Sequence, residues 1–257
     1  MEILKIIKGS LLIFYVTFLF SCNKDEGVGT VGLAKINVIN AVVSGGNVKA
    51  NVGIKDLPWS SIADNKILGG FNDLGRLYLA PTNGSIYLRV APISDTTKLW
   101  YDQQKQLSEG TMYTLYLSGT PSNVRTSFHE ELNFPKYIVR DAGQRLPSVD
   151  SIVNIRFVNL SPSGPQVDIN IKGESSKEAS DLGYETFTNF KAYPATTGIE
   201  EILFEIRKSS DGSLVATYSF SVDFYRFRSV TVMMMGIYLG SGLPDTDQYK
   251  VESVVYQ

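Results

Sequence analysis

The chain contains a single cysteine and a single histidine, and both scarcities exclude whole classes of chemistry. One cysteine cannot form a disulfide within the chain, so no disulfide framework supports the fold. One histidine and one cysteine cannot supply the three or four nitrogen and sulfur ligands of a usual zinc site. We therefore expect no metal, and no motif for any other cofactor is present.

An excess of basic residues is also missing. The 24 Lys and Arg residues are matched by 26 Asp and Glu residues, and no basic run is longer than two residues. Nucleic-acid binding needs clustered positive charge, so we expect no nucleic-acid partner. Phosphate-binding glycine motifs are missing as well, because neither G-x-x-x-x-G-K-[ST] nor a strand-linked G-x-G-x-x-G occurs.

Long apolar runs are absent, and the most apolar segment covers only residues 11–20. A transmembrane helix needs about 20 apolar residues, so this run is too short to span a bilayer. Lys5 and Lys8 before it and Ser21 after it are typical of a secretory signal peptide. The sequence predicts a signal peptide over residues 1–21 and an exported protein.

The one cysteine lies directly after this segment. Leu19, Phe20, Ser21 and Cys22 resemble the lipobox of bacterial lipoproteins, in which the thiol receives a diacylglyceryl group before the chain is cleaved ahead of the cysteine. The resemblance implies that Cys22 is lipidated. Several acyl chains, each contributing about 0.8 kcal/mol per buried methylene, would then hold the protein on a membrane. An unmodified cysteine near an ordinary cleavage site is the alternative.

Residues 22–32 are polar and contain several glycines. Lys24, Asp25 and Glu26 resemble the export signal with which Bacteroidetes-type lipoproteins reach the outer face of the outer membrane. The resemblance implies a lipid-anchored outer-membrane protein that faces the cell exterior. The same residues are also typical of a flexible, solvated tether, and both interpretations place a soluble body outside the cytoplasm.

From about residue 33 the chain consists of short stretches that alternate apolar and polar residues, separated by Gly, Pro, Asn, Asp and Ser. No apolar stripe of helical period extends over ten residues, so the pattern predicts an all-β fold. In the first half we expect strands at 34–43, 47–54, 74–80, 85–91, 97–101, 111–118 and 135–141. In the second half we expect them at 152–159, 166–172, 184–192, 201–208, 213–221, 227–235 and 249–256.

Four sequence blocks recur in the same order, which indicates a duplicated domain. The blocks that begin at Ala34, Phe71, Tyr113 and Lys136 align with those that begin at Val153, Tyr184, Val230 and Gln248. We predict two tandem immunoglobulin-like antiparallel β-sandwich domains, at 33–142 and 149–257, joined by a linker at 143–148. A small barrel is the alternative.

One stretch of the second copy, VNLSPSGPQVDINIKG at residues 158–173, resembles the opening of a domain of unknown function that occurs in tandem in Bacteroidetes lipoproteins. The match is carried by Asn159, Ser161, Pro162, Pro165, Val167 and Asp168. The resemblance implies a β-sandwich with no established activity. The first copy reads INAVVSGGNVKANVGI from Ile39 and lacks the Ser-Pro pair.

Candidates for catalysis are few. His129 has Ser127 two residues before it and Glu130 and Glu131 after it, but no G-x-S-x-G motif is present and the local sequence predicts a loop. Pairs of acids could hydrolyse glycosides, yet the acids of this chain are more typical of surface charge. These candidate acids are Glu130, Glu131, Glu200, Glu201, Asp245 and Asp247. We therefore assign no catalytic residue and predict that the protein is not an enzyme.

The remaining candidates are aromatic. Trp59, Trp100 and Tyr101 occur in the first half, and indole and phenol rings are surfaces on which sugars stack. They are candidate ligand-binding residues, although Trp59 or Trp100 could instead close one end of the sandwich. The sequence favours a non-catalytic surface module that binds a glycan or an envelope or host protein. A surface hydrolase of polysaccharide or peptide and a structural spacer of a surface complex are the alternatives.

The lipid anchor is directly testable. Replacing Cys22 with Ala removes the thiol that would carry the acyl chains, so we expect the protein to leave the membrane fraction. Detergent phase partitioning of the native and C22A chains measures the change. Unchanged partitioning of the variant would contradict lipidation.

Overall fold

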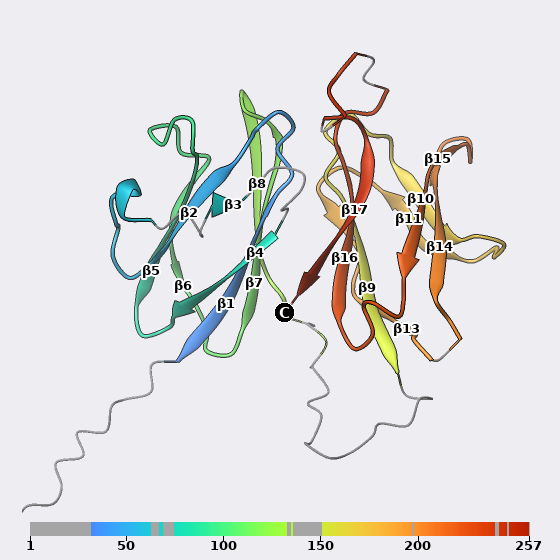
Figure 1. Ribbon diagram of the computed structural model, residues 1–257, viewed down its shortest axis with the longest axis horizontal. Coiled ribbons are helices and arrows are strands. Elements are labelled where there is room, and N and C mark those ends of the chain that lie inside the picture. Colours follow the sequence, from blue (N-terminus) through green and yellow to red (C-terminus); the bar gives the residue numbers. More distant parts are fainter. Residues whose placement is uncertain are drawn as a thin grey trace, which may run out of the picture. The chain divides into compact units, whose positions relative to one another are not determined.

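The computed structural model describes residues 32–62, 67–68, 75–132, 135, 151–196, 198–239, 242–245 and 247–256 (Figure 1). Leu33–Gln257 form one compact unit, which is built almost entirely from β-strands and contains one short 3₁₀ turn, η1 (Trp59–Ser61), in its described part. The chain is therefore all-β, as its alternating pattern predicts. The predicted signal peptide, Cys22, Lys24, Asp25, Glu26 and the linker at 143–148 lie outside the described residues.

Eight strands of the first half form two four-stranded sheets. They are β1 (Leu33–Asn40), β2 (Val48–Gly53), β3 (Ile67–Leu68), β4 (Gly75–Pro81), β5 (Ser85–Pro92), β6 (Tyr101–Gln106), β7 (Met112–Thr120) and β8 (Asn123–Glu130). One sheet has the order β4-β1-β7-β8, with β1 and β7 parallel and the other pairs antiparallel. The other sheet has the order β3-β2-β5-β6 and is antiparallel.

The second half repeats this strand order. Its strands are β9 (Ile152–Asn159), β10 (Val167–Ile171), β11 (Lys177–Leu182), β12 (Thr186–Phe187), β13 (Lys191–Pro194), β14 (Glu201–Lys208), β15 (Leu214–Ser221), β16 (Ser229–Met235) and β17 (Lys250–Tyr256). One sheet has the order β12-β9-β16-β17, with β9 and β16 parallel and β13 also paired to β9. The other has the order β11-β10-β14-β15. The immunoglobulin-like assignment and the domain boundaries stay predictions.

Several predicted strands are wrong or shifted. The strand predicted at 97–101 is β6, which begins only at Tyr101, and the one predicted at 184–192 is interrupted and divides into β12 and β13. Strands β8 and β11 were not predicted. Both lie at sheet edges, where exposed polar residues obscure the apolar alternation. The predicted strand at 135–141 lies outside the described residues, apart from position 135, which is not in a strand.

The alignment of the fourth sequence block is also wrong. β8 pairs with β7 just as β17 pairs with β16, and the first strand of each pair has a glycine of positive φ at its end, Gly119 at 86° and Gly236 at 85°. A Cβ at these glycines would lie 2.3 Å from the carbonyl oxygen of Asn123 and 2.1 Å from that of Gln248. Gln248 therefore corresponds to Asn123 and not to Lys136.

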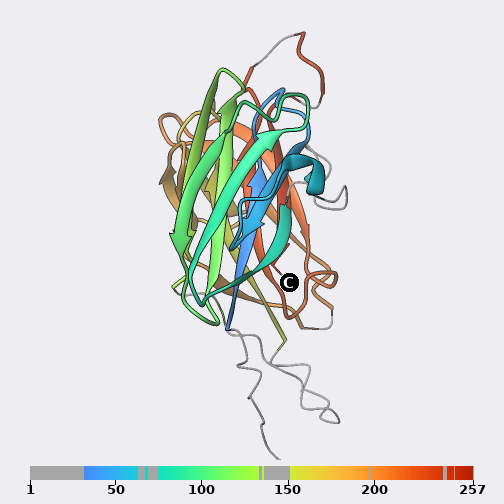
Figure 2. The same ribbon diagram turned by 90° about the vertical axis from the view of Figure 1, so that its left-hand side faces the viewer.

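Each half closes its two sheets on its own hydrophobic core, and Figures 1 and 2 show the layered strands. The first core contains Leu115 and Leu117 of β7 with Ile86 and Leu88 of β5. The second is richer in aromatic rings and contains Phe157, Phe204 and Phe220, together with Val230, Val232 and Met234 of β16. In both halves every second residue of the central strands points into the core.

The intervening residues of the central strands are buried as well. They form a third hydrophobic cluster that joins the β4-β1-β7-β8 sheet of the first half to the β12-β9-β16-β17 sheet of the second. Its members are Ile39, Ala41, Val43, Tyr116, Val158, Leu160, Met233, Met235 and Val254. We call these two sheets the facing sheets and the other two the outer sheets. The strands β7 and β16 are therefore buried on both faces almost throughout their length.

A buried ion pair lies beside this cluster. Arg156 of β9 donates two hydrogen bonds, each 2.7 Å long, to the two carboxylate oxygens of Glu131, and both side chains are less than 7% exposed. The same guanidinium donates to the hydroxyls of Tyr116 and Tyr256 at 2.6 Å. Thr231 accepts its Nε proton at 2.9 Å. Because the partners come from both halves, this polar cluster fixes one facing sheet against the other.

Removing one residue of this polar cluster should lower the stability of the protein. Breaking a buried ion pair leaves an uncompensated charge, so we expect Arg156→Met to lower the free energy of unfolding by about 3–5 kcal/mol. Urea denaturation of the purified protein measures the loss. The double variant R156M/E131L should lose less than the sum of the two single variants, because it leaves no unpaired charge.

Arg125 provides the matched control. It also forms an ion pair between the halves, with Glu185 at 3.3 Å, but its side chain is 58% exposed. Exposed pairs contribute roughly 0–1 kcal/mol, so Arg125→Ala should have a small effect. Equal losses for the two single Arg variants would show that the Arg156 pair does not stabilise the contact between the halves.

Candidate functional site

The aromatic residues singled out from the sequence do not form a common binding surface. Tyr101 is only 6% exposed and belongs to the first core, where burial raises the pKa of its hydroxyl to about 12. Its buried ring offers no free face on which a sugar could stack. Trp59 lies half-buried in η1.

Trp100 is half-buried and packs against the first core. A Cβ at Gly45 would lie 2.8 Å from Cη2 of Trp100, so the indole rests on the turn between β1 and β2. This placement favours the alternative in which Trp100 closes one end of the sandwich. Its exposed part remains a candidate for stacking, as does that of Trp59.

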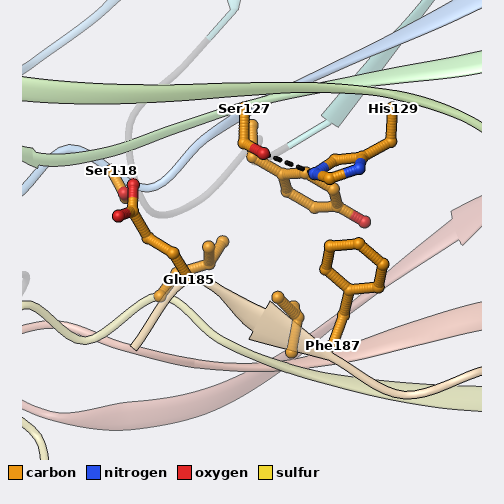
Figure 3. A pocket seen from close by; sticks show the side chains of 8 residues that line it. Ser118, Ser127, His129, Glu185 and Phe187 are labelled. Atoms are coloured by element: carbon orange, nitrogen blue, oxygen red, sulfur yellow. Dashed lines mark hydrogen bonds between the residues drawn. The ribbon is translucent and has the colours of Figure 1, made fainter. Parts of the chain in front are cut away.

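The side chains of Ser127 and His129 are in contact, because the two residues are neighbours on one face of the same strand. Both lie on β8, two positions apart, so their side chains point to the same face and Ser127 Oγ hydrogen-bonds to His129 Nε2 (Figure 3). The loop predicted at this place is therefore wrong. Phe187 of β12 packs edge-on against the imidazole, with 4.4 Å between the ring centres.

The cavity beside this pair is small. It is lined by Tyr116, Ser118, Val158, Leu160, Glu185 and Phe187 in addition to Ser127 and His129, and its volume of about 10 Å³ is room for one water molecule. A peptide or glycoside does not fit such a space. The pair therefore offers no support for a serine hydrolase.

The outer sheet of the second half carries a larger, polar hollow. β10 alternates, with Val167 and Ile169 in the core and Asp168 and Asn170 on the other face. The register sets Asp168 opposite Arg207 and Asn170 opposite Glu205 on β14. These four polar side chains therefore lie on the outer face of two neighbouring strands. Directly opposite residues on one face are about 5 Å apart, so the side chains lie close together.

Turns at the ends of these strands complete the hollow, which has a volume of about 610 Å³. Its walls add Gly173, Glu174, Ser175, Lys177, Ser209 and Gly212. Aromatic and aliphatic side chains are absent from this lining, so we call it the polar hollow. Its volume lies within the range of about 300–1,000 Å³ that small-molecule sites occupy.

Every charge of the polar hollow except that of Glu174 has an opposite partner. Lys177 donates to Asp168, which also accepts from Ser209 Oγ at 2.9 Å. Arg207 donates from Nη2 to Glu205 at 2.9 Å and from Nη1 to the carbonyl oxygen of Gly212 at 3.0 Å. The hydrogen-bonding groups of the floor are therefore held in place before any ligand arrives.

The pKa values of the two floor carboxyls argue against acid catalysis. Partial burial acts to raise the pKa of Asp168, but the hydrogen bonds from Lys177, the Asp181 amide and Ser209 outweigh it, and the pKa is lowered. The hydrogen bond from Arg207 lowers the pKa of Glu205. A glycosidase acid needs a raised pKa to donate its proton, and neither carboxyl has one.

Sequence reasoning did not identify the polar hollow. Asp168 was noticed only as part of the resemblance to a domain of unknown function. A signal was present, because VDINI and FEIRK each alternate apolar residues with polar ones that must share the outer face. What the sequence could not supply was the register that brings β10 and β14 together.

The comparisons with known proteins add no assignment. The chain matches no protein-family profile and no curated protein. Among the described residues, no three His, Cys, Asp or Glu side chains are arranged to hold a metal ion. The described part of the chain also lacks any helix with the length and apolar character needed to cross a membrane.

The single histidine permits a clean titration. Burial lowers the pKa of His129 below its ordinary value of 6.5, the charge of Glu131 partly opposes this, and the charge of Arg156 adds to it. We expect the imidazole NMR signal to titrate with a midpoint below 6.5, whereas the urea-unfolded chain should show about 6.5.

This shift also fixes the direction of one pH effect on stability. The unfolded chain binds the proton more readily, so the contribution of His129 is fully present above pH 6.5 and is lost as the pH falls toward the folded-state pKa. A folded-state midpoint at or above 6.5 would contradict the burial of the neutral imidazole.

Proposed function

We propose that the protein is a non-catalytic, lipid-anchored binding module of the outer membrane, and that the polar hollow binds a glycan. The observation that carries this proposal is the polar hollow itself, a space of ligand size whose lining is entirely polar. Attachment through Cys22 and export through Lys24, Asp25 and Glu26 would place the hollow at the cell exterior.

A hydroxyl-rich ligand matches the chemistry of the floor. Sugar hydroxyls both donate and accept hydrogen bonds, and the floor offers carboxylate acceptors beside guanidinium, ammonium and amide donors. Because Asp168 and Glu205 are already paired with Lys177 and Arg207, a neutral ligand leaves no buried charge without a partner. Three acids against two bases in the lining favour a neutral over an anionic glycan.

A glycan array with the purified native protein tests the proposal, followed by calorimetric titration of each glycan that binds. The variant E205A/R207A removes a paired carboxylate and guanidinium together, so the net charge is unchanged. We expect it to weaken binding at least about 10-fold, which corresponds to 1.4 kcal/mol.

The control is R89A/D102A, which removes an Arg and an Asp, 3.2 Å apart, from the outer sheet of the first half and likewise leaves the net charge unchanged, although Arg89 also pairs with Asp56. It should bind the glycan as the native protein does. Loss of binding only in W59A/W100A would instead assign the glycan to the aromatic residues, and a native protein that binds no glycan would refute the proposal.

A further inference from the structure

One sheet edge of this protein lacks the usual protection against pairing. Open sheets carry charged residues, prolines or very short strands at their edges, because an exposed backbone ladder pairs with other chains. Charged residues or prolines occur in the edge strands β4, β6, β8, β11, β13 and β17, and β3 and β12 are two residues long. Among the described edge strands, β15 alone is long and has neither charge nor proline, since its sequence is LVATYSFS.

The free side of β15 can be assigned from the hydrogen bonds to β14. The amide of Val222 donates to the carbonyl oxygen of Glu200 at 2.8 Å, directly beyond the end of the regular pairing. In an antiparallel pair, alternate residues direct their main-chain groups to the same neighbour. The main-chain N–H and C=O groups of Thr217, Ser219 and Ser221 therefore point away from β14, and all three residues are exposed.

We propose that β15 pairs with β15 of a second copy of this chain, antiparallel and across a two-fold axis. Such a pair is self-complementary, because no charged side chain of one strand meets a like charge of the other. On the outer face, Ser219 of each copy would lie opposite Ser219 of the other, and Thr217 would lie opposite Ser221. The three outward-pointing residues would supply the new ladder of main-chain hydrogen bonds.

The ends of the strand fit the same arrangement. Leu214 at the start of β15 is 52% exposed, and Phe224, three residues beyond its end, is 68% exposed. Antiparallel pairing brings the start of one strand to the end of the other, so Leu214 of each copy approaches Phe224 of its partner. Burial of these two exposed apolar side chains stabilises pairing with a second copy of this chain. An arbitrary extended peptide would not bring both side chains to the same places.

The two-fold axis of such a pair stands perpendicular to the sheet, so both outer faces point the same way. The two four-stranded sheets would become one continuous sheet that carries a polar hollow at each side. A multivalent ligand could then occupy both hollows, which raises avidity without any new contact. The strand pairing itself does not depend on what the polar hollow binds.

Sedimentation velocity of the full-length protein, extracted in a mild detergent, tests the pairing. We expect a dimer whose mass halves in Thr217→Pro, because proline removes an outward amide that β14 does not use. Thr217→Lys keeps the amide and adds like charges at the pair, so it should also give a monomer. Gln104→Lys, on the corresponding edge strand β6, is the control and should remain a dimer.

Amide hydrogen exchange gives a second readout that is specific to this edge. In the native dimer the Ser219 amide should be protected, and in T217K it should exchange freely while the Phe204 amide on β14 stays protected. A native protein that is monomeric at every concentration would overturn the proposal. So would a dimer that persists in both Thr217 variants, or an edge occupied only by the peptide of another protein.

Discussion

The contact between the two halves depends on one buried guanidinium. Arg156 is 3% exposed and would be strongly destabilising without partners, because removing a charge from water costs several kcal/mol. Its bidentate bond to Glu131 and its bonds to two tyrosine hydroxyls satisfy it. Glu131 and Tyr116 belong to the first half and reach Arg156 only when the facing sheets meet, so this one arrangement of the halves offsets the cost of burying the charge.

The two halves share an asparagine at the end of the first strand, where the sequence alignment pairs Asn40 with Asn159. In the first, Asn40 donates from Nδ2 to the carbonyl oxygen of Gly46 at 3.0 Å, and in the second Asn159 donates likewise to Pro165 at 3.2 Å. Each asparagine also accepts the amide two residues later, at Val42 and Ser161. The turn after the first strand is therefore held by asparagine. The missing Ser-Pro pair of the first half does not alter it.

The sequence pattern predicts the strands that are buried on both faces. It does not predict the features that depend on how the strands are paired. The sequence predicts β7 and β16 to within a residue or two, because burial of both faces leaves an apolar run within each strand, LYL in β7 and VMMM in β16. β8 was missed because an edge strand that buries only part of Val124 and Phe128 has a weak alternation. The polar hollow depends on Asp168 lying opposite Arg207, which are 39 positions apart, and composition alone does not determine such pairing.

Burial of the facing sheets also limits where this protein can contact anything else. The cores and the third cluster cover both faces of β1, β7, β9 and β16 over most of their length, so these strands have little surface left for a ligand. In the described part of the body, binding surfaces therefore belong to the outer sheets and the free edges. The β11-β10-β14-β15 sheet combines both, with the polar hollow on its face and the uncharged strand β15 at its edge. A single sheet thus carries both of the proposed sites, and substitutions on either one leave the buried Arg156 cluster unchanged.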